Sequence, residues 1–342
     1  MTNISAFVLI NGKQGHRLVG LWESITWSGD TKEAARTVSI KLYNTADGKK
    51  KKLDIPIGSL LRLYDDKTEI FRGFIFKSEI SENGEQTLTA YDSNIYLTKS
   101  SDSLVFKKKT ASQIIKQLCT TFGIPYGNIV DTKTVLPKLV LRGKTLYEMI
   151  IIALTETQKI SGNKYLLGNS QGKVTLAQVN TVYAKHRVYS KINITSSSFS
   201  ESIEERKTQI KLTGGSEDEI KATATLKSPA AIAKYGVMQH YENFSDVETK
   251  AKLNTLANSL LSQLNVTTQE FSVDVIGNIT FVSGAKVLVE ETMSNTTGLF
   301  YITADSHTFN ADGTHTTSLT LQRKLELASE EYDDPTSTEA KV

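Results

Sequence analysis

The sequence is poor in the residues that most often carry chemistry. It has one cysteine, Cys119, in 342 residues, so neither an internal disulfide nor a zinc site built from this chain's own thiolates is possible. Cys119 falls on the apolar side of a predicted helix, which favours a buried structural thiol. Of the five histidines, only His307 and His315 are predicted to face each other, across a hairpin. Without a third ligand, this pair favours hairpin packing over a metal site.

Long hydrophobic runs are also absent. The most apolar segment, residues 149–154, is far too short to cross a bilayer. Residues 1–12 lack the basic region of a signal peptide and predict a strand. We therefore expect synthesis in a cytoplasm and no membrane segment.

Charge of one sign is scarce as well. The formal net charge is +3 with 23% charged residues, whereas a nucleic-acid-binding protein usually has a concentrated basic stripe. The one basic run, Lys49 to Lys52, follows Asp47-Gly48 between two predicted strands. A solvated loop explains it better than a phosphate-binding patch, because so few lysines neutralise few phosphates.

Catalytic motifs are missing. Gly168-Asn-Ser-Gln-Gly172 has the Gly-x-Ser-x-Gly spacing, but it joins two predicted strands in a hairpin and is therefore not a nucleophile elbow, which needs a strand followed by a helix. The chain has no phosphate-binding loop or dinucleotide fingerprint, and residues 214–219 lack the alternating oxygen ligands of a calcium loop. Adjacent carboxylates at Asp65-Asp66 and Glu204-Glu205 are not a pair placed across a cleft. We expect no enzyme activity, no cofactor, and no catalytic, cofactor-binding or metal-binding residue. Asp65, Glu204 and Glu219 are the carboxylates whose mutation would test this.

Two stretches far apart in the chain predict the same kind of module. Each is a series of short alternating strands broken by Gly, Asn and Asp, as in a small antiparallel barrel or sandwich. The predicted strands are 6–10, 24–27, 37–43, 60–64, 70–79 and 86–91 in the first module, and 271–275, 286–289, 298–302, 307–309 and 317–321 in the second. The fold class predicted is α+β and β-rich, with two tube-like antiparallel β-barrels carrying α+β and helical insertions.

Helical periodicity separates the two modules. Thr110 is a predicted N-cap, Thr145 with Glu148 forms a predicted capping box, and Ser245 with Glu248 forms another. The predicted domains are a first barrel at 1–104, an α+β insertion at 105–190, a second barrel at 191–222 with 265–328, a helical insertion at 223–264, and an acidic flexible tail at 329–342.

The order of several short motifs resembles a known family. The motifs are Trp27-Ser-Gly-Asp30, Arg36-Thr-Val-Ser-Ile40, Phe71-Arg-Gly-Phe-Ile-Phe76, Leu88-Thr-Ala-Tyr-Asp-Ser93, Thr110-Ala-Ser-Gln-Ile-Ile115, Phe122-Gly-Ile-Pro125, Tyr235-Gly-Val-Met-Gln239, Gly298-Leu-Phe-Tyr-Ile302 and His307-Thr-Phe309. Together they are similar to the PBSX-type XkdQ/YqbQ proteins. Those proteins belong to the broad late-control-protein-D class of baseplate hubs in contractile phage tails and tailocins. The resemblance extends to about Leu325.

The resemblance implies a homotrimeric structural hub with two tube-like barrels per subunit. Such a trimer adapts the sixfold tail tube to the threefold spike and forms part of the central channel. The implied partners are tail tube, spike, baseplate wedge and tape measure proteins, with DNA only as passing cargo. The implied location is a virion or tailocin particle assembled in the bacterial host cytoplasm. Two alternatives stay open: a tube or spike-adjacent protein of the same particle, and a cell-wall-binding or wall-degrading tail protein, since exposed tyrosines bind sugars and the chain has 13 Tyr.

Overall fold

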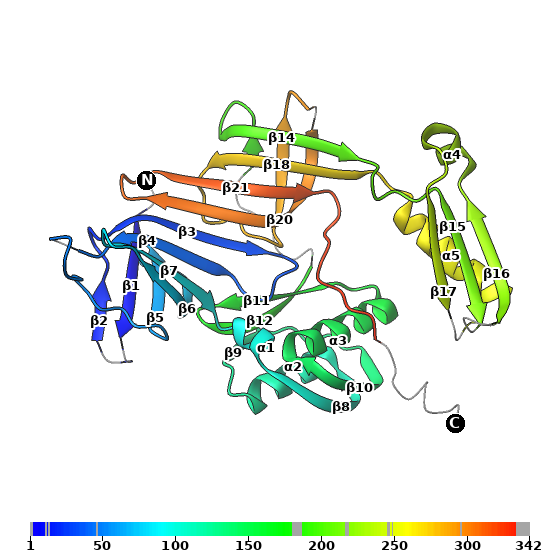
Figure 1. The fold of residues 1–342 in the computed structure, drawn as a ribbon, viewed down its shortest axis with the longest axis horizontal. Coiled ribbons are helices and arrows are strands. Elements are labelled where there is room, and N and C mark those ends of the chain that lie inside the picture. Colours follow the sequence, from blue (N-terminus) through cyan, green and yellow to red (C-terminus); the bar gives the residue numbers. More distant parts are fainter. Residues whose placement is uncertain are drawn as a thin grey trace. The chain divides into compact units, whose positions relative to one another are not determined.

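Strands dominate the computed structural model of the protein (Figure 1), as expected for a β-rich α+β chain. The structure describes residues 3–10, 12, 14–45, 47–179, 187–215, 219–244, 247, 249–294 and 296–332. His186, the predicted cap residues Ser245 and Glu248, and the tail from residue 333 lie outside them. The chain divides into two units, taken separately below: Met1–Ser197 with Ser272–Val342, and Ser198–Phe271.

The first β-module of the larger unit is an antiparallel sheet that curls around one core. Its strands run in the order β3-β4-β7-β6-β5-β1-β2. Their bounds are β1 (Ile4–Ile10), β2 (Gln14–Arg17), β3 (Trp22–Asp30), β4 (Thr37–Tyr43), β5 (Leu60–Asp65), β6 (Thr68–Ile80) and β7 (Glu85–Asp92). Side chains alternate along each strand, and the inward ones, such as Val8, Ile25 and Leu61, are fully buried. The sequence missed β2, because its four residues carry no apolar alternation.

The second β-module follows the order β13-β19-β20-β21-β18-β14. Its strands are β13 (Val188–Tyr189), β14 (Ile194–Ser202), β18 (Thr268–Ile276), β19 (Lys286–Glu291), β20 (Thr296–Asn310) and β21 (His315–Gln322). Val273, Val287 and Leu321 are among its buried residues. The predicted segments 298–302 and 307–309 belong to one long strand, β20, which turns into β21 at Gly313.

The two modules share one continuous sheet. Residues 304–310 of β20 pair antiparallel with residues 24–30 of β3, so each module supplies one strand of the junction. Figure 1 shows β20 and β3 running side by side. The sequence predicted two separate modules and had no means of finding this pairing, because alternation marks the faces of a strand but not its neighbour.

An α+β insertion lies between the modules in sequence. Its elements are α1 (Ile95–Lys99), β8 (Ser101–Thr110), α2 (Ala111–Thr121), β9 (Tyr126–Ile129), β10 (Val135–Thr145), α3 (Leu146–Ser161), β11 (Tyr165–Ser170) and β12 (Lys173–Gln178). Thr110 caps α2 and Thr145 caps α3, each through a complete capping box. The predicted boundary at residue 105 is wrong, because it cuts β8, which pairs with β10, and because Leu97 already belongs to the insertion's core.

The smaller unit corrects the predicted second barrel and helical insertion. It holds β15 (Gln209–Gly215), β16 (Ile220–Lys227), α4 (Pro229–Tyr235), β17 (Gln239–Phe244) and α5 (Lys250–Leu264). β15 pairs with β16 and β17 in a sheet of its own, so residues 209–222 are not barrel strands and residues 223–264 are not only helical. The reason is packing within this unit: Ile210 and Leu212 of β15 share a core with Leu253 and Ala257 of α5.

The chain after β21 also departs from prediction. Residues 329–332, assigned to a flexible tail, are held against the α+β insertion. Glu330 pairs with Lys144, and Glu331 pairs with Lys159. The backbone N–H of Val140 donates to the Tyr332 hydroxyl at 2.9 Å. These residues are therefore fixed despite their acidic composition, because two lysines and a backbone N–H of the insertion bind them.

Candidate functional site

The residues that the sequence singled out do not converge on one site. Asp65 ends β5, Glu204 follows β14 and Glu219 precedes β16; none of these carboxylates is buried. Lys49 to Lys52 lie in an exposed loop between β4 and β5, where the Asp47 carboxylate accepts the N–H groups of Lys49 and Lys50. Cys119 is buried on α2, and burial raises the pKa of its thiol to about 11. The thiol therefore stays protonated at neutral pH, as expected of a buried structural cysteine.

His307 and His315 do face each other, as the sequence predicted. The Nδ1 of His307 lies 3.2 Å from the Nε2 of His315, which is a hydrogen-bond distance. In the part of the chain that the structure describes, no group of three or more His, Cys, Asp or Glu is placed to hold a metal ion. The pair instead belongs to a buried polar network at the junction between the modules.

The outward face of the shared sheet carries an unbroken band of hydroxyl groups. Register places Thr316, Thr308, Thr26, Ser39 and Thr89 in one row across β21, β20, β3, β4 and β7. The neighbouring row crosses four of the same strands with Ser318, Ser306, Ser28 and Thr37. We call these nine residues the hydroxyl ladder. None of the nine is buried, and the ladder crosses the β20–β3 junction without a break.

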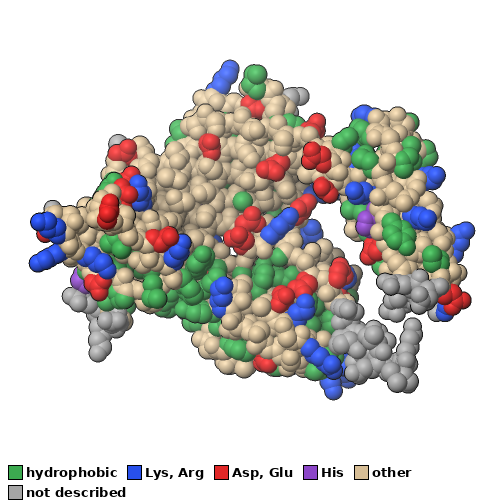
Figure 2. Space-filling view, viewed as in Figure 1, with side chains coloured by type: hydrophobic (Ala, Val, Ile, Leu, Met, Phe, Trp, Pro, Cys, Tyr) green, Lys and Arg blue, Asp and Glu red, His purple; other side chains and the backbone are tan. Residues whose placement is uncertain are grey.

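Charges are few around the ladder, and those present are engaged. The Asp274 carboxylate accepts hydrogen bonds of 2.6 Å from both Ser196 and Ser318, which lower its pKa. Lys41 pairs with Glu23 at 2.9 Å. In Figure 2 the surface over β21 and β20 is drawn mostly in tan, the colour of backbone and of side chains that are neither charged nor hydrophobic. The nine ladder residues themselves therefore offer no cation to phosphate and no large apolar side chain to protein.

The inward face of the same strands holds a buried ion pair. Nη1 of Arg36, from the loop after β3, donates to Oδ1 of Asp305 on β20 at 2.9 Å, and Nη2 donates to Oδ2. The guanidinium also lies 4.2 Å from the centre of the Trp27 ring. Burial alone would raise the pKa of Asp305, but the Arg36 charge and the hydrogen bonds from His307 and Arg36 hold it at about 2. Asp305 is therefore ionised throughout the neutral range.

His307 extends this network, and its surroundings indicate its tautomer. Its Nε2 lies 3.0 Å from the Phe281 carbonyl oxygen and 3.3 Å from Asp305 Oδ2, both of which only accept hydrogen bonds at neutral pH. Nε2 must therefore carry the hydrogen. The Nδ1 of His307 lies 3.1 Å from the Thr317 hydroxyl. The His307 ring also packs 4.9 Å from Trp27 across the junction.

Gly29 makes room for the ion pair. A Cβ at this position would lie 2.3 Å from Nη1 of Arg36, so only glycine lets the guanidinium cross β3. The motifs Trp27-Ser-Gly-Asp30, Arg36 and His307-Thr-Phe309 are thus brought together in one junction. The sequence did not predict this meeting. A signal for the ladder was present, however, because Ser or Thr stands at alternate positions at 26 and 28, 37 and 39, 306 and 308, and 316 and 318.

Comparison with known proteins identifies the family of this chain. A family model described as YQBQ-like matches residues 25–322. YqbQ of Bacillus subtilis is 30% identical over 304 residues, which cover 88% of this chain and 92% of YqbQ. The phage-like element PBSX protein XkdQ of the same organism is 27% identical over 304 residues, with the same coverage of 88% and 92%.

A solved structure shares the fold at low identity. The crystal structure of the 43 kDa tail protein of prophage MuSo2 from Shewanella oneidensis is similar with a TM-score of 0.71 and 14% identity, over 93% of this chain and 98% of that chain. Among the described residues, no helix is both long and apolar enough to cross a membrane.

Proposed function

This chain belongs to the YqbQ-like family, and we propose that it is a structural hub of a phage-type tail baseplate, three copies of which surround a channel lined by the hydroxyl ladder. The names of the relatives support the setting, since XkdQ is a protein of a phage-like element and the MuSo2 protein is a tail protein. The proposal includes no catalytic activity. The proposed role is to hold the baseplate together and to guide what passes through the channel.

The continuous sheet is the observation that carries the proposal. Two β-modules joined edge to edge by β20 and β3 present one smooth face rather than two separate ones. Three such chains supply six modules, which is the number needed to match a sixfold tube while keeping threefold symmetry toward a spike. A hydroxyl face across the junction keeps the lining uniform within each chain.

The chemistry of the ladder suits a surface over which a polymer moves. Lysine or arginine at these positions would bind DNA phosphates and release counterions, which slows passage. Large apolar side chains would adhere to a tape measure protein. Threonine and serine avoid both effects, and threonine also favours the extended backbone of a strand.

The remaining parts of the proposal concern neighbours. We place the α+β insertion and the smaller unit away from the channel, where they contact wedge, tube or spike proteins. Assembly takes place in the bacterial host, and the mature location is the tail baseplate of a virion or tailocin particle.

A reconstruction of the particle by cryo-electron microscopy tests the proposal directly. The expected result is three copies of this chain around a channel, with Thr308 and Thr26 facing the axis. A ring of six copies, or a ladder buried against another subunit, would overturn it.

Site-specific labelling gives a second test. With Cys119 buried, Thr308→Cys should react with a bulky maleimide in the free protein and be protected in the particle. Thr120→Cys, on the exposed side of α2, is the matched control and reports whether the insertion stays accessible.

The wall-degrading alternative would instead show peptidoglycan turnover lost on mutating Asp65, Glu204 or Glu219.

A further inference from the structure

The outward face of the first β-module changes character partway round the sheet. On β3 and β4 it carries the hydroxyl ladder, whereas on β1, β5 and β6 it carries aromatic, aliphatic and arginine side chains. Register places Leu9 opposite Leu60 and Leu60 opposite Phe74. The next row places Phe7 opposite Arg62 and Arg62 opposite Arg72. Aromatic residues and arginine are the types enriched where proteins bind each other, and serine is depleted there.

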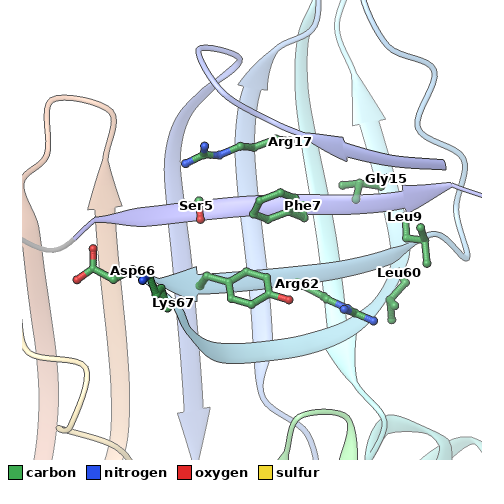
Figure 3. Close-up of a pocket in the computed structure, with 11 residues that line it drawn as sticks. Ser5, Phe7, Leu9, Gly15, Arg17, Leu60, Arg62, Asp66 and Lys67 are labelled. Carbon is green, nitrogen blue, oxygen red and sulfur yellow. The ribbon is translucent and has the colours of Figure 1, made fainter.

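This second surface is hollowed. A groove of about 560 Å³ lies over β1, β2 and β5 (Figure 3). Phe7, Leu9, Leu60 and Tyr64 supply its apolar lining. Figure 3 shows Phe7 between Arg17 on one side and Arg62 on the other. Leu60 also lines a second hollow of about 590 Å³ that reaches the α+β insertion.

The arginines of the groove have no carboxylate of their own. Arg17 stacks on Phe7, with its guanidinium carbon 5.7 Å from the ring centre, and forms no ion pair among the described residues. The Nε of Arg62 is buried and has no hydrogen-bond partner in the described protein. Glu69, the nearby carboxylate, is already taken by Arg72 at 2.6 Å and by the Tyr64 hydroxyl at 3.0 Å.

We propose that this groove docks a segment of a different protein that places a carboxylate beside an apolar side chain. The apolar anchor would lie against Phe7, Leu9 and Leu60, and the carboxylate would accept hydrogen bonds from Arg62 and Arg17. A guanidinium whose buried Nε has no partner in the described protein favours a carboxylate over a neutral ligand, because it can bind a carboxylate in a two-pronged geometry. Lys67 on the rim adds positive charge and Asp66 offsets part of it. This docking surface is separate from the hydroxyl ladder and does not depend on it.

A small aryl carboxylate tests the recognition chemistry. We would titrate 3-phenylpropionate and its neutral analogue 3-phenylpropanol into the full chain and follow binding by saturation-transfer NMR. The carboxylate should bind at least about tenfold more tightly than the alcohol. Arg62→Met should abolish that preference, since it keeps the chain length but removes the charge. Arg142→Met, an exposed arginine on β10, is the matched control and should change nothing. Equal binding of the two probes, or an unchanged preference in Arg62→Met, would overturn the proposal.

Photo-crosslinking in assembled particles identifies the occupant. With p-benzoylphenylalanine at position 64, the expected product joins this chain to another protein of the particle at a peptide that carries Asp or Glu beside an apolar residue. A crosslink to a second copy of this chain, to a peptide without a carboxylate, or to nothing would overturn the proposal. Circular dichroism of the Tyr64 variant checks that the module remains folded.

Discussion

Arg36 and Asp305 stand 269 positions apart and form a buried, two-pronged ion pair across the junction of the two β-modules. The Asp305 carboxylate is fully shielded and also accepts the backbone N–H of Ser283 at 2.6 Å. Its partner Arg36 comes from the loop that joins β3 to β4. One charged side chain from each module therefore links the two modules on the inward face of the shared sheet, while the hydroxyl ladder lies on the outward face.

Breaking this pair should destabilise the whole larger unit. Arg36→Met and Asp305→Asn are each expected to lower the free energy of unfolding by about 3 kcal/mol or more, because each leaves one buried polar partner uncompensated. The double variant Arg36→Met/Asp305→Asn should cost less than the sum of the single changes. Urea denaturation followed by tryptophan fluorescence measures all three. Lys32→Met is the control, since it removes an exposed pair with Glu326 and should cost no more than about 1 kcal/mol. Strict additivity in the double variant would contradict the coupling.

His315 should make the protein sensitive to mild acid. Burial and the neighbouring His307 lower the pKa of His315 to about 4, against an ordinary value near 6.5. The unfolded chain therefore takes up a proton before the folded one, and stability falls as pH drops from about 6.5 to about 4. His315→Gln should flatten that fall in a series of urea titrations. An unchanged slope would show that His315 is not the group responsible.

Asp92 works in the opposite direction within an overlapping pH range. Burial raises its pKa to about 6, although the N–H groups of Arg36 and Asn94 donate to it. The folded state therefore retains a proton that the unfolded chain loses near pH 4, and this contribution to stability fades as pH rises from about 4 to 6. The informative quantity for His315 is consequently the difference between wild type and variant, in which the Asp92 contribution cancels.

Glycines at close backbone approaches should not tolerate alanine. A Cβ at Gly73 would lie 2.1 Å from the Tyr91 carbonyl oxygen. Neither β6 nor β7 can move apart to make room without breaking the backbone hydrogen bonds that pair them. Gly73→Ala should therefore cost about 2 kcal/mol or more of unfolding free energy. Gly15→Ala is the control, because the nearest atom there is 3.9 Å away. Thermal melts of the two variants compare them, and equal melting temperatures would refute the steric argument.

Gly29 differs from Gly73 in that its neighbour is a side chain. Gly29→Ala would displace the Arg36 guanidinium, so its cost should be large in the wild-type background and smaller in Arg36→Met. Denaturation of the four proteins of this cycle measures the coupling. A similar cost of Gly29→Ala in both backgrounds would mean that the glycine serves the strand and not the ion pair.

Charge added to the hydroxyl ladder should affect function and leave stability alone. Thr308→Lys lies on the unburied face of β20 and should change the free energy of unfolding by less than about 0.5 kcal/mol. In assembled particles it should reduce DNA delivery or killing, because the added lysines would face the cargo in the proposed channel. Thr120→Lys on α2 is the matched control and should retain activity. Equal activity of the two variants would remove the ladder from the channel.

The individual strands and helices were largely predictable because their signals are local. Alternation marked the principal strands of the first module, and the predicted N-cap at Thr110 and capping box at Thr145 marked the starts of α2 and α3 within a residue. The wrong assignment of residues 209–222 had a non-local cause. Residues 209–222 have the alternation of a barrel strand, but α5 covers them and places them in the smaller unit.

The sequence by itself determined which residues share a face of each principal strand, that Thr110 and Thr145 cap α2 and α3, and that one cysteine allows no zinc site built from this chain's own thiolates. Only the tertiary structure decided which strands are neighbours. The pairing of β20 with β3 turned four separate Ser/Thr alternations into one ladder and brought Arg36 to Asp305. The physical reason is that side-chain period is a property of one strand, whereas register and sheet order depend on contacts between segments hundreds of residues apart.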